Sequence, residues 1–469
     1  DVRQSAQEIS RAVEHMKRHT TQGMAPDQGK NSNINALAVL AGATGESIPD
    51  TGTTTYRPPF VPVPIGAMGA GGSGTGFAPQ RHTTSHHASL KRKAPMIEAG
   101  FWYRPSYFPA KGEKTWRQSC DREVTMVREN LGVCDVSTLG KIDVQGPDAA
   151  AFLDFLYTSK MSTLKLGRVR YGLMLREDGF VMDDGTCARL GEQHYLVTTT
   201  TAAAGQVMRH FEFAHQCLRP DWDVRFVSAT EQWSQFAIAG PKSLGLISEL
   251  LGASFDIADW PFMSCGAVSI GDLSARLFRI SFSGEMGWEL AVPARFGSAL
   301  FNALVERAEA LGGGPYGMEA LNVLRIEKGF ITHAEIDGRV TMHDLGMSGM
   351  MSPSKDFIGK AMAARPGLVD PQRGQLIGLK AEGSVKQLIA GSHLFAPGAE
   401  PIRENSQGYI SSVGYSPTLG RMVGLGFLQN GLQRHGEKVR MIEHLSGVSA
   451  TCEVVPPVQF ALEGGRMRD

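Results

Sequence analysis

Residues 173–201 read LMLREDGFVMDDGTCARLGEQHYLVTTTT and hold the clearest fold signal in the chain. The alternation predicts a strand, a hairpin turn and a returning strand over Leu173–Leu175, Arg176–Gly179 and Phe180–Met182. Asp183 and Asp184 interrupt the returning strand. Because successive strand residues face opposite sides, one of these carboxylates must point inward. A buried carboxylate without a partner is costly, so the pattern predicts either a ligand-facing acid or two solvated carboxylates at a strand end.

Two segments further along carry candidate binding residues. Residues 279–290 read RISFSGEMGWEL, which places Glu285 in a glycine-rich turn between two strands. Glycines let a ligand approach the backbone closely, and a carboxylate that accepts two N–H bonds suits an aminopyrimidine ring. A simple hairpin tip is the alternative. Tyr316–Phe330 predicts an amphipathic helix, and Arg325 and Glu327 near its end are either functional or a surface pair.

Two strand–turn–helix units surround the hairpin. Residues 142–153 and 236–247 each run from an alternating strand through Gly-Pro into an amphipathic helix, with Gly146 and Gly240 at the turns. Proline costs no hydrogen bond in the first turn of a helix. Short strands separated by Gly, Pro and Asn are then expected after residue 370, at Gln375–Lys380, Gly408–Tyr415, Gly424–Phe427, Lys438–Ile442 and Ala450–Val455.

Composition excludes several classes of protein. The 469 residues contain 47 Lys and Arg and 47 Asp and Glu, so a basic surface for nucleic acid is not expected. No apolar run reaches the roughly 20 residues of a membrane helix. The six cysteines form no CxxC pair, which argues against a zinc or iron–sulfur site and favours reduced thiols in a cytoplasmic protein. The start at Asp1, without Met or a signal pattern, predicts a fragment or a trimmed subunit.

The predicted organisation is α+β with four regions. Residues 1–42 are expected to be the tail of a helical domain, with one helix over 5–20 that places Ile9 and Met16 on the same face. Residues 43–95 predict a Pro/Gly-rich linker, 96–370 a large mixed domain and 371–469 a small antiparallel barrel. Gly69–Gly74 fits G-x-G-x-x-G, but it lacks the preceding strand and following helix that a dinucleotide site needs.

Four motifs in register, together with a later fifth one, give a family resemblance. GFVMDD, YLVTT, SGEMGWE, LRIEKG and the late DFIGK at 356–360 resemble the aminomethyltransferase (glycine-cleavage T-protein) family. The resemblance implies a large folate-binding domain followed by the barrel. Upstream, HMKRHTTQGMAPDQGKNSN at 15–33 and FVPVPIG at 60–66 resemble the alpha subunits of heterotetrameric sarcosine oxidases, of which this chain would be the C-terminal half.

The resemblance implies a tetrahydrofolate site. Asp184 matches the essential second aspartate of the family and is expected beside the reactive nitrogens of the folate. Glu285 matches the glutamate that grips the pterin, Thr199 a pterin-contacting position, and Arg325 belongs to the L-R-x-E motif. No metal is expected. Family members carry Ala-Arg-Asp before that motif, whereas residues 320–322 are Ala-Leu-Asn here, so one folate-contacting arginine is missing.

The implied function is a sarcosine oxidase that forms 5,10-methylenetetrahydrofolate, glycine and hydrogen peroxide. Beta, gamma and delta subunits would be its partners, with FMN at the alpha–beta boundary and FAD and NAD elsewhere in the complex. Thr20–Asn33 is the expected alpha-side wall of the FMN site. Two alternatives stay open: a stand-alone aminomethyltransferase that uses a lipoyl carrier, and a folate-binding scaffold without catalysis.

Overall fold

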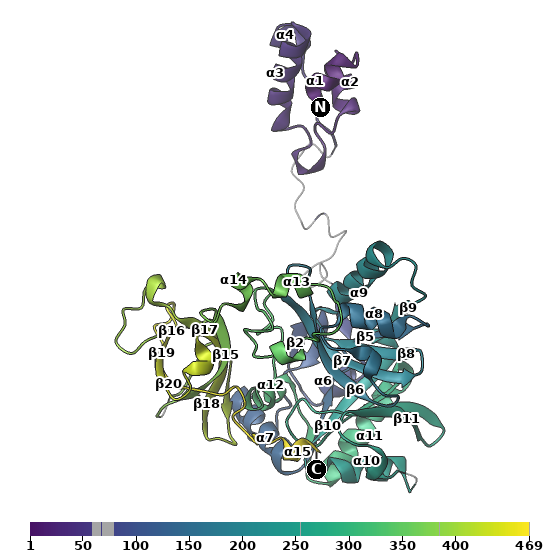
Figure 1. Cartoon of the computed structure of the whole chain (residues 1–469), viewed down its shortest axis with the longest axis vertical. Helices are drawn as coiled ribbons and strands as arrows, with labels where there is room; N and C mark the ends of the chain where they lie inside the picture. Colours follow the sequence, from purple (N-terminus) through teal and green to yellow (C-terminus); the bar gives the residue numbers. More distant parts are fainter. Residues whose placement is uncertain (59–66, 68–78, 254, 384, 469) are drawn as a thin grey trace. The chain divides into compact units, whose positions relative to one another are not determined.

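The computed structural model describes residues 1–58, 67, 79–253, 255–383 and 385–468 (Figure 1). The chain divides into two compact units, Asp1–Pro79 and Gln80–Asp469. The glycine motif Gly69–Gly74 and most of the proline-rich part of the predicted linker lie outside the described residues.

The first unit is a small helical cluster. Its helices are α1 (Val2–Gln7), α2 (Val13–His19), α3 (Ser32–Thr44) and α4 (Ile48–Thr51), with a 3-10 turn at Ala25–Asp27. The single helix expected over 5–20 is broken, because Ile9 has a φ of 76° and separates α1 from α2. Ile9 is therefore 85% exposed, whereas Met16 is fully buried against Ala36 and Leu40.

Ordered structure extends into both ends of the predicted linker. At its start, Ser47 caps α4 by accepting a hydrogen bond from the backbone of Asp50, and Lys17 donates to the Thr55 carbonyl at 2.8 Å. At its end, β1 (Arg81–His82) and α6 (His86–Lys91) belong to the second unit. Local caps and buried contacts thus order residues whose composition alone is typical of a linker.

The second unit contains two large sheets and one small one. The five-stranded sheet has the order β6-β7-β8-β5-β9, and the six-stranded sheet β11-β12-β13-β10-β4-β14. Their strands are β4 (Gly132–Asp135), β5 (Gly140–Gln145), β6 (Val169–Leu175), β7 (Val181–Gly191), β8 (His194–Thr199), β9 (Arg225–Ser228), β10 (Trp233–Ala239), β11 (Ser264–Ile270), β12 (Leu273–Arg279), β13 (Gly287–Pro293) and β14 (Gly314–Pro315). The small sheet joins β1, β2 (Met96–Ala99) and β3 (Trp102–Pro105).

The helices of the second unit pack on these sheets (Figure 1). They are α7 (Trp116–Glu129), α8 (Ala149–Leu156), α9 (Ala204–Phe213), α10 (Ser243–Leu251), α11 (Gly297–Ala310) and α12 (Met318–Glu327), with the short α13 (Lys360–Ala363), α14 (Pro366–Val369) and α15 (Gly465–Arg468). The two Gly-Pro turns lead from β5 into α8 and from β10 into α10. Gly146 and Gly240 have φ of 134° and 127°, and a side chain at either position would strike backbone atoms within 2.5 Å.

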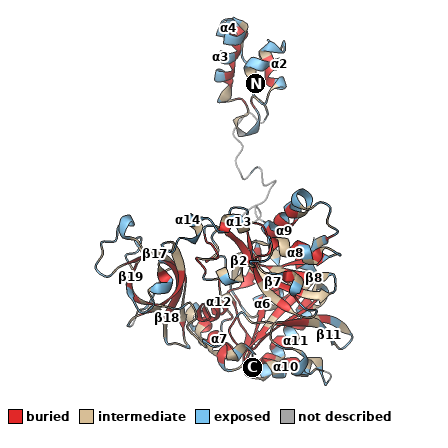
Figure 2. Ribbon diagram, viewed as in Figure 1, coloured by how far each residue is buried: buried red, intermediate tan, exposed pale blue. Residues whose placement is uncertain are grey.

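The last strands close into an antiparallel barrel. Its order is β15-β18-β17-β16-β19-β20, and its strands are β15 (Gly374–Ala381), β16 (His393–Phe395), β17 (Gly408–Ser416), β18 (Arg421–Gln429), β19 (Lys438–Ile442) and β20 (Ser449–Val455). The five predicted strand segments are confirmed, and the short β16 is the one that the pattern missed. Buried residues fill both the barrel and the sheets of the second unit (Figure 2).

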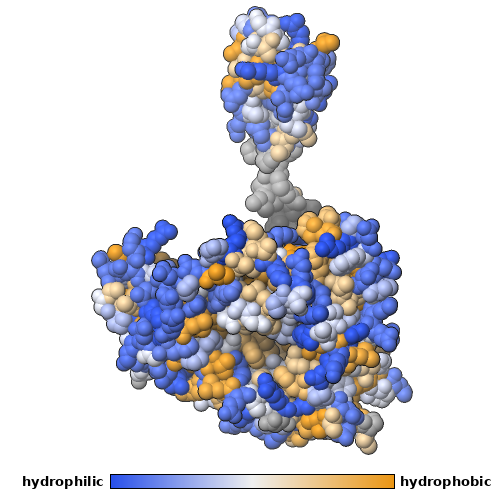
Figure 3. All heavy atoms as spheres, viewed as in Figure 1, coloured by the Kyte–Doolittle hydropathy of each residue, from blue (hydrophilic) through white to orange (hydrophobic). Residues whose placement is uncertain are grey.

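The surface view in Figure 3 is mostly hydrophilic, with scattered hydrophobic patches. Within the described residues, no helix combines the length and apolar character needed to cross a membrane.

Candidate functional site

Asp184 lies within β7, because the returning strand of the predicted hairpin continues through both aspartates to Gly191 instead of being interrupted by them. It is on β7 opposite Leu173 of β6, and it is 8% exposed. The Tyr171 hydroxyl donates to its Oδ2 at 2.7 Å. Its buried Oδ1 has no hydrogen-bond partner among the described residues. A buried carboxylate oxygen without a partner is costly, which fits a group that binds a ligand donor.

Burial changes the acidity of both aspartates. It raises the pKa of Asp184 to about 6, opposed by the hydrogen bond from Tyr171 and helped by the charge of Glu335. Burial and then the charge of Asp184 raise the pKa of Asp183 to about 7. Each carboxyl group can therefore gain or lose a proton near neutral pH, as acid–base catalysis requires.

These raised pKa values predict how stability depends on pH. An unfolded Asp loses its proton near pH 3.9, whereas Asp184 in the folded protein has a pKa of about 6. Between these two pH values the folded state binds more protons than the unfolded state, so the folded protein loses stability as the pH rises. We expect Asp184→Asn to remove a contribution of about 1–2 kcal/mol to the difference in unfolding free energy between pH 5 and pH 8. Urea unfolding of both proteins at the two pH values measures this. Identical pH dependence would contradict it.

Thr199 does not lie beside Asp184. Cys187 of β7 pairs with Val197 of β8, so strand alternation puts Thr199 on the same face as Val197 and puts Asp184 on the opposite face. The Thr199 hydroxyl donates to the Thr200 carbonyl at 2.9 Å. Thr200, not Thr199, contacts the aspartate pair, by donating from its hydroxyl to Asp183 at 2.7 Å. The pterin contact of Thr199 stays a prediction.

Glu285 lies in the turn between β12 and β13 and is 1% exposed. Arg128 from α7 donates to its Oε1 at 2.7 Å, and Arg466 donates through Nε to Oε1 and Oε2 at 3.0 and 2.9 Å. Arg128 also donates through Nε to Glu327 at 3.0 Å. The carboxylates of Glu285 and Glu327 and the guanidinium groups of Arg128 and Arg466 thus form one cluster. In it the positive charges of the arginines compensate the negative charges of the two buried acids.

Arg325 is held by the protein on all three nitrogen atoms. It donates to Asn322, to the Phe330 carbonyl, to Glu335 at 2.9 Å and to Ser412 at 2.5 Å. Arg325 is 3% exposed and Glu335 is fully buried. The charge of Glu335 also raises the pKa of Asp184. Arg325 is thus connected to Asp184 through Glu335, its ion-pair partner. A direct contact of Arg325 with folate stays a prediction.

Helix α12 links the two parts of the site. It carries Arg325, which pairs with Glu335, and Glu327, which pairs with the same Arg128 that contacts Glu285. Four residues of this site were not predicted from the sequence: Tyr171, Arg128, Glu335 and Arg466. Tyr171 could have been found, because it lies two residues before Leu173 on the same strand face.

Among the described residues, no group of three or more His, Cys, Asp or Glu side chains could hold a metal ion. None of the described cysteines forms a disulfide bond.

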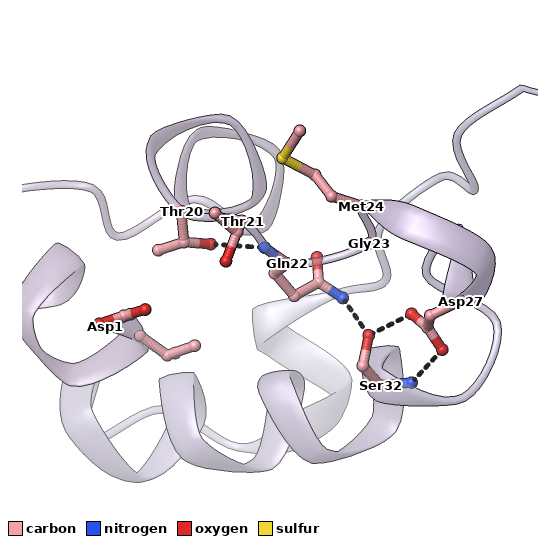
Figure 4. A pocket seen from close by; sticks show the side chains of 9 residues that line it. Asp1, Thr20, Thr21, Gln22, Gly23, Met24, Asp27 and Ser32 are labelled. Carbon is pink, nitrogen blue, oxygen red and sulfur yellow. Dashed lines mark hydrogen bonds between the residues drawn. The ribbon is translucent and has the colours of Figure 1, made fainter. Parts of the chain in front are cut away.

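A separate pocket lies in the first unit. It has a volume of about 320 Å³ and is lined by Asp1, Val2, Thr20, Thr21, Gln22, Gly23, Met24, Asp27 and Ser32 (Figure 4). Gln22 donates to Ser32 at 3.4 Å, and Ser32 donates to Asp27 at 2.5 Å. Seven of these nine lining residues, all except Asp1 and Val2, lie within the Thr20–Asn33 segment that was expected to form one wall of the FMN site.

Comparison with known families identifies the fold of the second unit. Residues 85–355 match the GCVT N-terminal domain, and residues 375–460 match the glycine cleavage T-protein C-terminal barrel domain. The chain belongs to the glycine-cleavage T-protein family. Residues 1–72, ahead of these T-protein domains, match the sarcosine oxidase A3 domain.

Individual relatives agree with this assignment to the T-protein family. The chain is 47% identical over 458 residues to sarcosine oxidase subunit alpha of Rhizobium meliloti, covering 97% of this chain and 46% of that protein. It is 37% identical over 466 residues to the same subunit of a Corynebacterium species, covering 97% and 48%. The chain thus spans about half the length of these curated relatives. The aminomethyltransferase of Streptomyces coelicolor is 31% identical over 341 residues, covering 71% and 86%.

A solved T-protein has the same fold. Aminomethyltransferase T of the glycine cleavage system from Bartonella henselae superposes with a TM-score of 0.69 at 21% identity, covering 81% of this chain and 98% of that one. The predicted α+β architecture with a C-terminal antiparallel barrel is therefore confirmed.

Proposed function

We propose that the chain is the folate-binding part of a sarcosine oxidase alpha subunit and that it transfers to tetrahydrofolate the one-carbon unit that arises when the N-methyl group of sarcosine is oxidised to the methylene level. The observation that carries the proposal is Asp184: a buried carboxylate with a pKa raised to about 6 and one oxygen without a partner among the described residues. The sarcosine oxidase A3 match over residues 1–72 favours this function over a stand-alone aminomethyltransferase or a folate-binding scaffold.

The residues present fit tetrahydrofolate. The unpartnered Oδ1 of Asp184 can accept an N–H donor, and the carboxylate of Glu285 suits the aminopyrimidine edge of a pterin. When bound, tetrahydrofolate supplies two amine nitrogens that take up a one-carbon unit.

In this proposal Asp184 holds or releases a proton at its carboxylate and stabilises neighbouring positive charge. Tyr171 fixes the orientation of that carboxylate through its 2.7 Å hydrogen bond. The charge of Glu335 helps to raise the pKa of Asp184, and Arg325 pairs with Glu335 at 2.9 Å. Thr199 and Arg325 are retained as candidate folate contacts.

The wider reaction is part of the same proposal. A partner subunit would oxidise sarcosine at a flavin, and the complete complex would yield 5,10-methylenetetrahydrofolate, glycine and hydrogen peroxide. Its partners would be beta, gamma and delta subunits, with FAD and NAD bound elsewhere, in the cytoplasm. A methylene group delivered inside a closed complex would avoid release as formaldehyde, which explains the value of a folate site in an oxidase.

For FMN we propose that the Thr20–Asn33 loop supplies one wall at the boundary with the beta subunit. Its pocket, at about 320 Å³, is at the low end of ligand sites, and its described lining offers hydroxyl and amide groups but no lysine or arginine (Figure 4). Asp1 and Asp27 also line this pocket, so a flavin phosphate would need a cationic partner from outside the lining.

Tetrahydrofolate titration of the full chain, followed by tryptophan fluorescence, tests the proposed function. We expect a saturable change in the wild-type protein and binding weaker by about tenfold or more in Glu285→Gln, because the charge-assisted hydrogen bonds to the pterin are lost. Glu289→Gln, a glutamate on neighbouring β13, is the matched control. The proposal fails if wild-type protein shows no saturable binding, or if both variants bind as tightly as wild type.

A further inference from the structure

The chain returns from the barrel to Glu285 at its end. We call residues 456–468 the return segment. After β20, the amides of Gln459 and Phe460 donate to the Glu327 carbonyl at 2.9 Å each, and Lys328 donates to the Ala461 carbonyl at 2.7 Å. In Figure 1 this yellow segment runs from the barrel past α7 to α15. It is thus anchored at the end of α12, beside the glutamate cluster.

Arg466 is the residue of the return segment that reaches Glu285. Its Nε donates to both carboxylate oxygens, and its Nη2 donates to the Arg128 carbonyl at 2.9 Å. The side chain of Arg466 is 44% exposed, against 5% for Arg128 and 2% for Glu285. Of the two arginines on Glu285, Arg128 is therefore the inner one and Arg466 the outer one, at the solvent side of the carboxylate.

The distal half of the return segment is held by few apolar contacts. Within residues 461–468 only Gly464 is buried, and Leu462 is 71% exposed. Besides the contacts of Arg466, its hydrogen bonds to the rest of the second unit include Lys328 to the Ala461 carbonyl and Arg279 to the Arg468 carbonyl, both at 2.7 Å. A segment held by polar contacts, with little buried apolar surface, opens at low free-energy cost.

We propose that the return segment is a latch on the pterin subsite: Arg466 occupies the Glu285 carboxylate in the free protein, and the aminopyrimidine edge of the folate displaces it. The inference rests on the proposed function. A guanidinium group and an aminopyrimidine both present N–H donors on an N–C–N unit, so they compete for the same two carboxylate oxygens. Arg128 stays on Glu285 during the exchange and keeps its charge compensated.

The latch makes two measurable predictions for Arg466→Gln. Without Arg466, folate no longer has to break the outer ion pair, so its Kd should fall about tenfold, which corresponds to about 1.4 kcal/mol. Hydrogen exchange in the peptides covering 456–468 should already be fast in the free variant. In the wild-type protein, exchange there should become faster when tetrahydrofolate is added.

Arg468→Gln is the matched control, since it removes the same charge from the same short helix while leaving the Arg466–Glu285 pair in place. Unchanged exchange on folate addition, or an Arg466→Gln Kd equal to or higher than that of Arg468→Gln, overturns the latch. If wild-type and Arg466→Gln proteins both fail to bind tetrahydrofolate, the proposed function fails and the latch with it. Binding to Arg466→Gln alone supports both.

Discussion

Asp184→Ala in the assembled oxidase is expected to lower the rate of methylenetetrahydrofolate formation by about 10²–10⁴-fold, the usual contribution of a positioned acid–base group. Flavin reduction by sarcosine should stay close to the wild-type rate, because the oxidation takes place in the partner subunit in our proposal. Stopped-flow flavin absorbance and a methylenetetrahydrofolate assay measure the two steps separately. The oxidised N-methyl carbon of sarcosine should then appear as formaldehyde.

Asp178→Asn is the control for Asp184→Ala. Asp178 lies in the turn of the same hairpin, pairs with Arg176 and has a side chain that is 50% exposed. Its loss should change neither step. Folate product formed at the normal rate by Asp184→Ala would remove the catalytic role of this carboxylate, whereas a loss of flavin reduction would show that the variant damages the complex as a whole.

The largest effect on stability is expected at Arg128. This side chain compensates Glu285 and Glu327, both buried, so Arg128→Ala leaves two acids without their shared inner partner. Breaking a buried ion pair on one side typically costs 3–5 kcal/mol, and we expect a loss of about that size in the urea unfolding free energy. Arg92→Ala, which breaks an Arg–Glu pair exposed on both sides, should cost about 0–1 kcal/mol.

A charge-neutral combination tests the reason for this loss. If uncompensated charge causes it, adding Glu285→Gln and Glu327→Gln to an Arg128→Met background should recover most of the stability, because no buried charge is then left unpaired. A triple variant as unstable as Arg128→Ala would mean that the packing of Arg128, whose guanidinium lies 4.4 Å from the Phe460 ring, matters more than its charge.

The sequence predicted local features well because they depend on neighbouring residues. Alternation located the 173–182 hairpin and the barrel strands, and apolar spacing located α12 within Tyr316–Phe330. The Asp183–Asp184 pair stood out because a carboxylate inside an apolar strand is a local anomaly, and the family resemblance then pointed to Asp184. The break at Ile9 was missed, because its left-handed φ leaves no mark in a helical pattern that continues on both sides.

The rest of the site depends on contacts between distant parts of the chain. Arg128 and Arg466 lie 157 and 181 residues from Glu285, and no spacing rule pairs them. The face of Thr199 follows from the register between β7 and β8, which only the folded sheet defines. The partners of Arg325 come from β17 and from Glu335, so its buried position could not be distinguished from a surface pair in the sequence.

A diffraction structure of the protein with tetrahydrofolate bound tests the account most directly. We predict electron density for the pteridine against the Glu285 carboxylate, with the reduced-ring amines within hydrogen-bond reach of Asp184 Oδ1. Density for the vitamin at another place, or an Asp184 side chain surrounded by bulk water, would contradict the account.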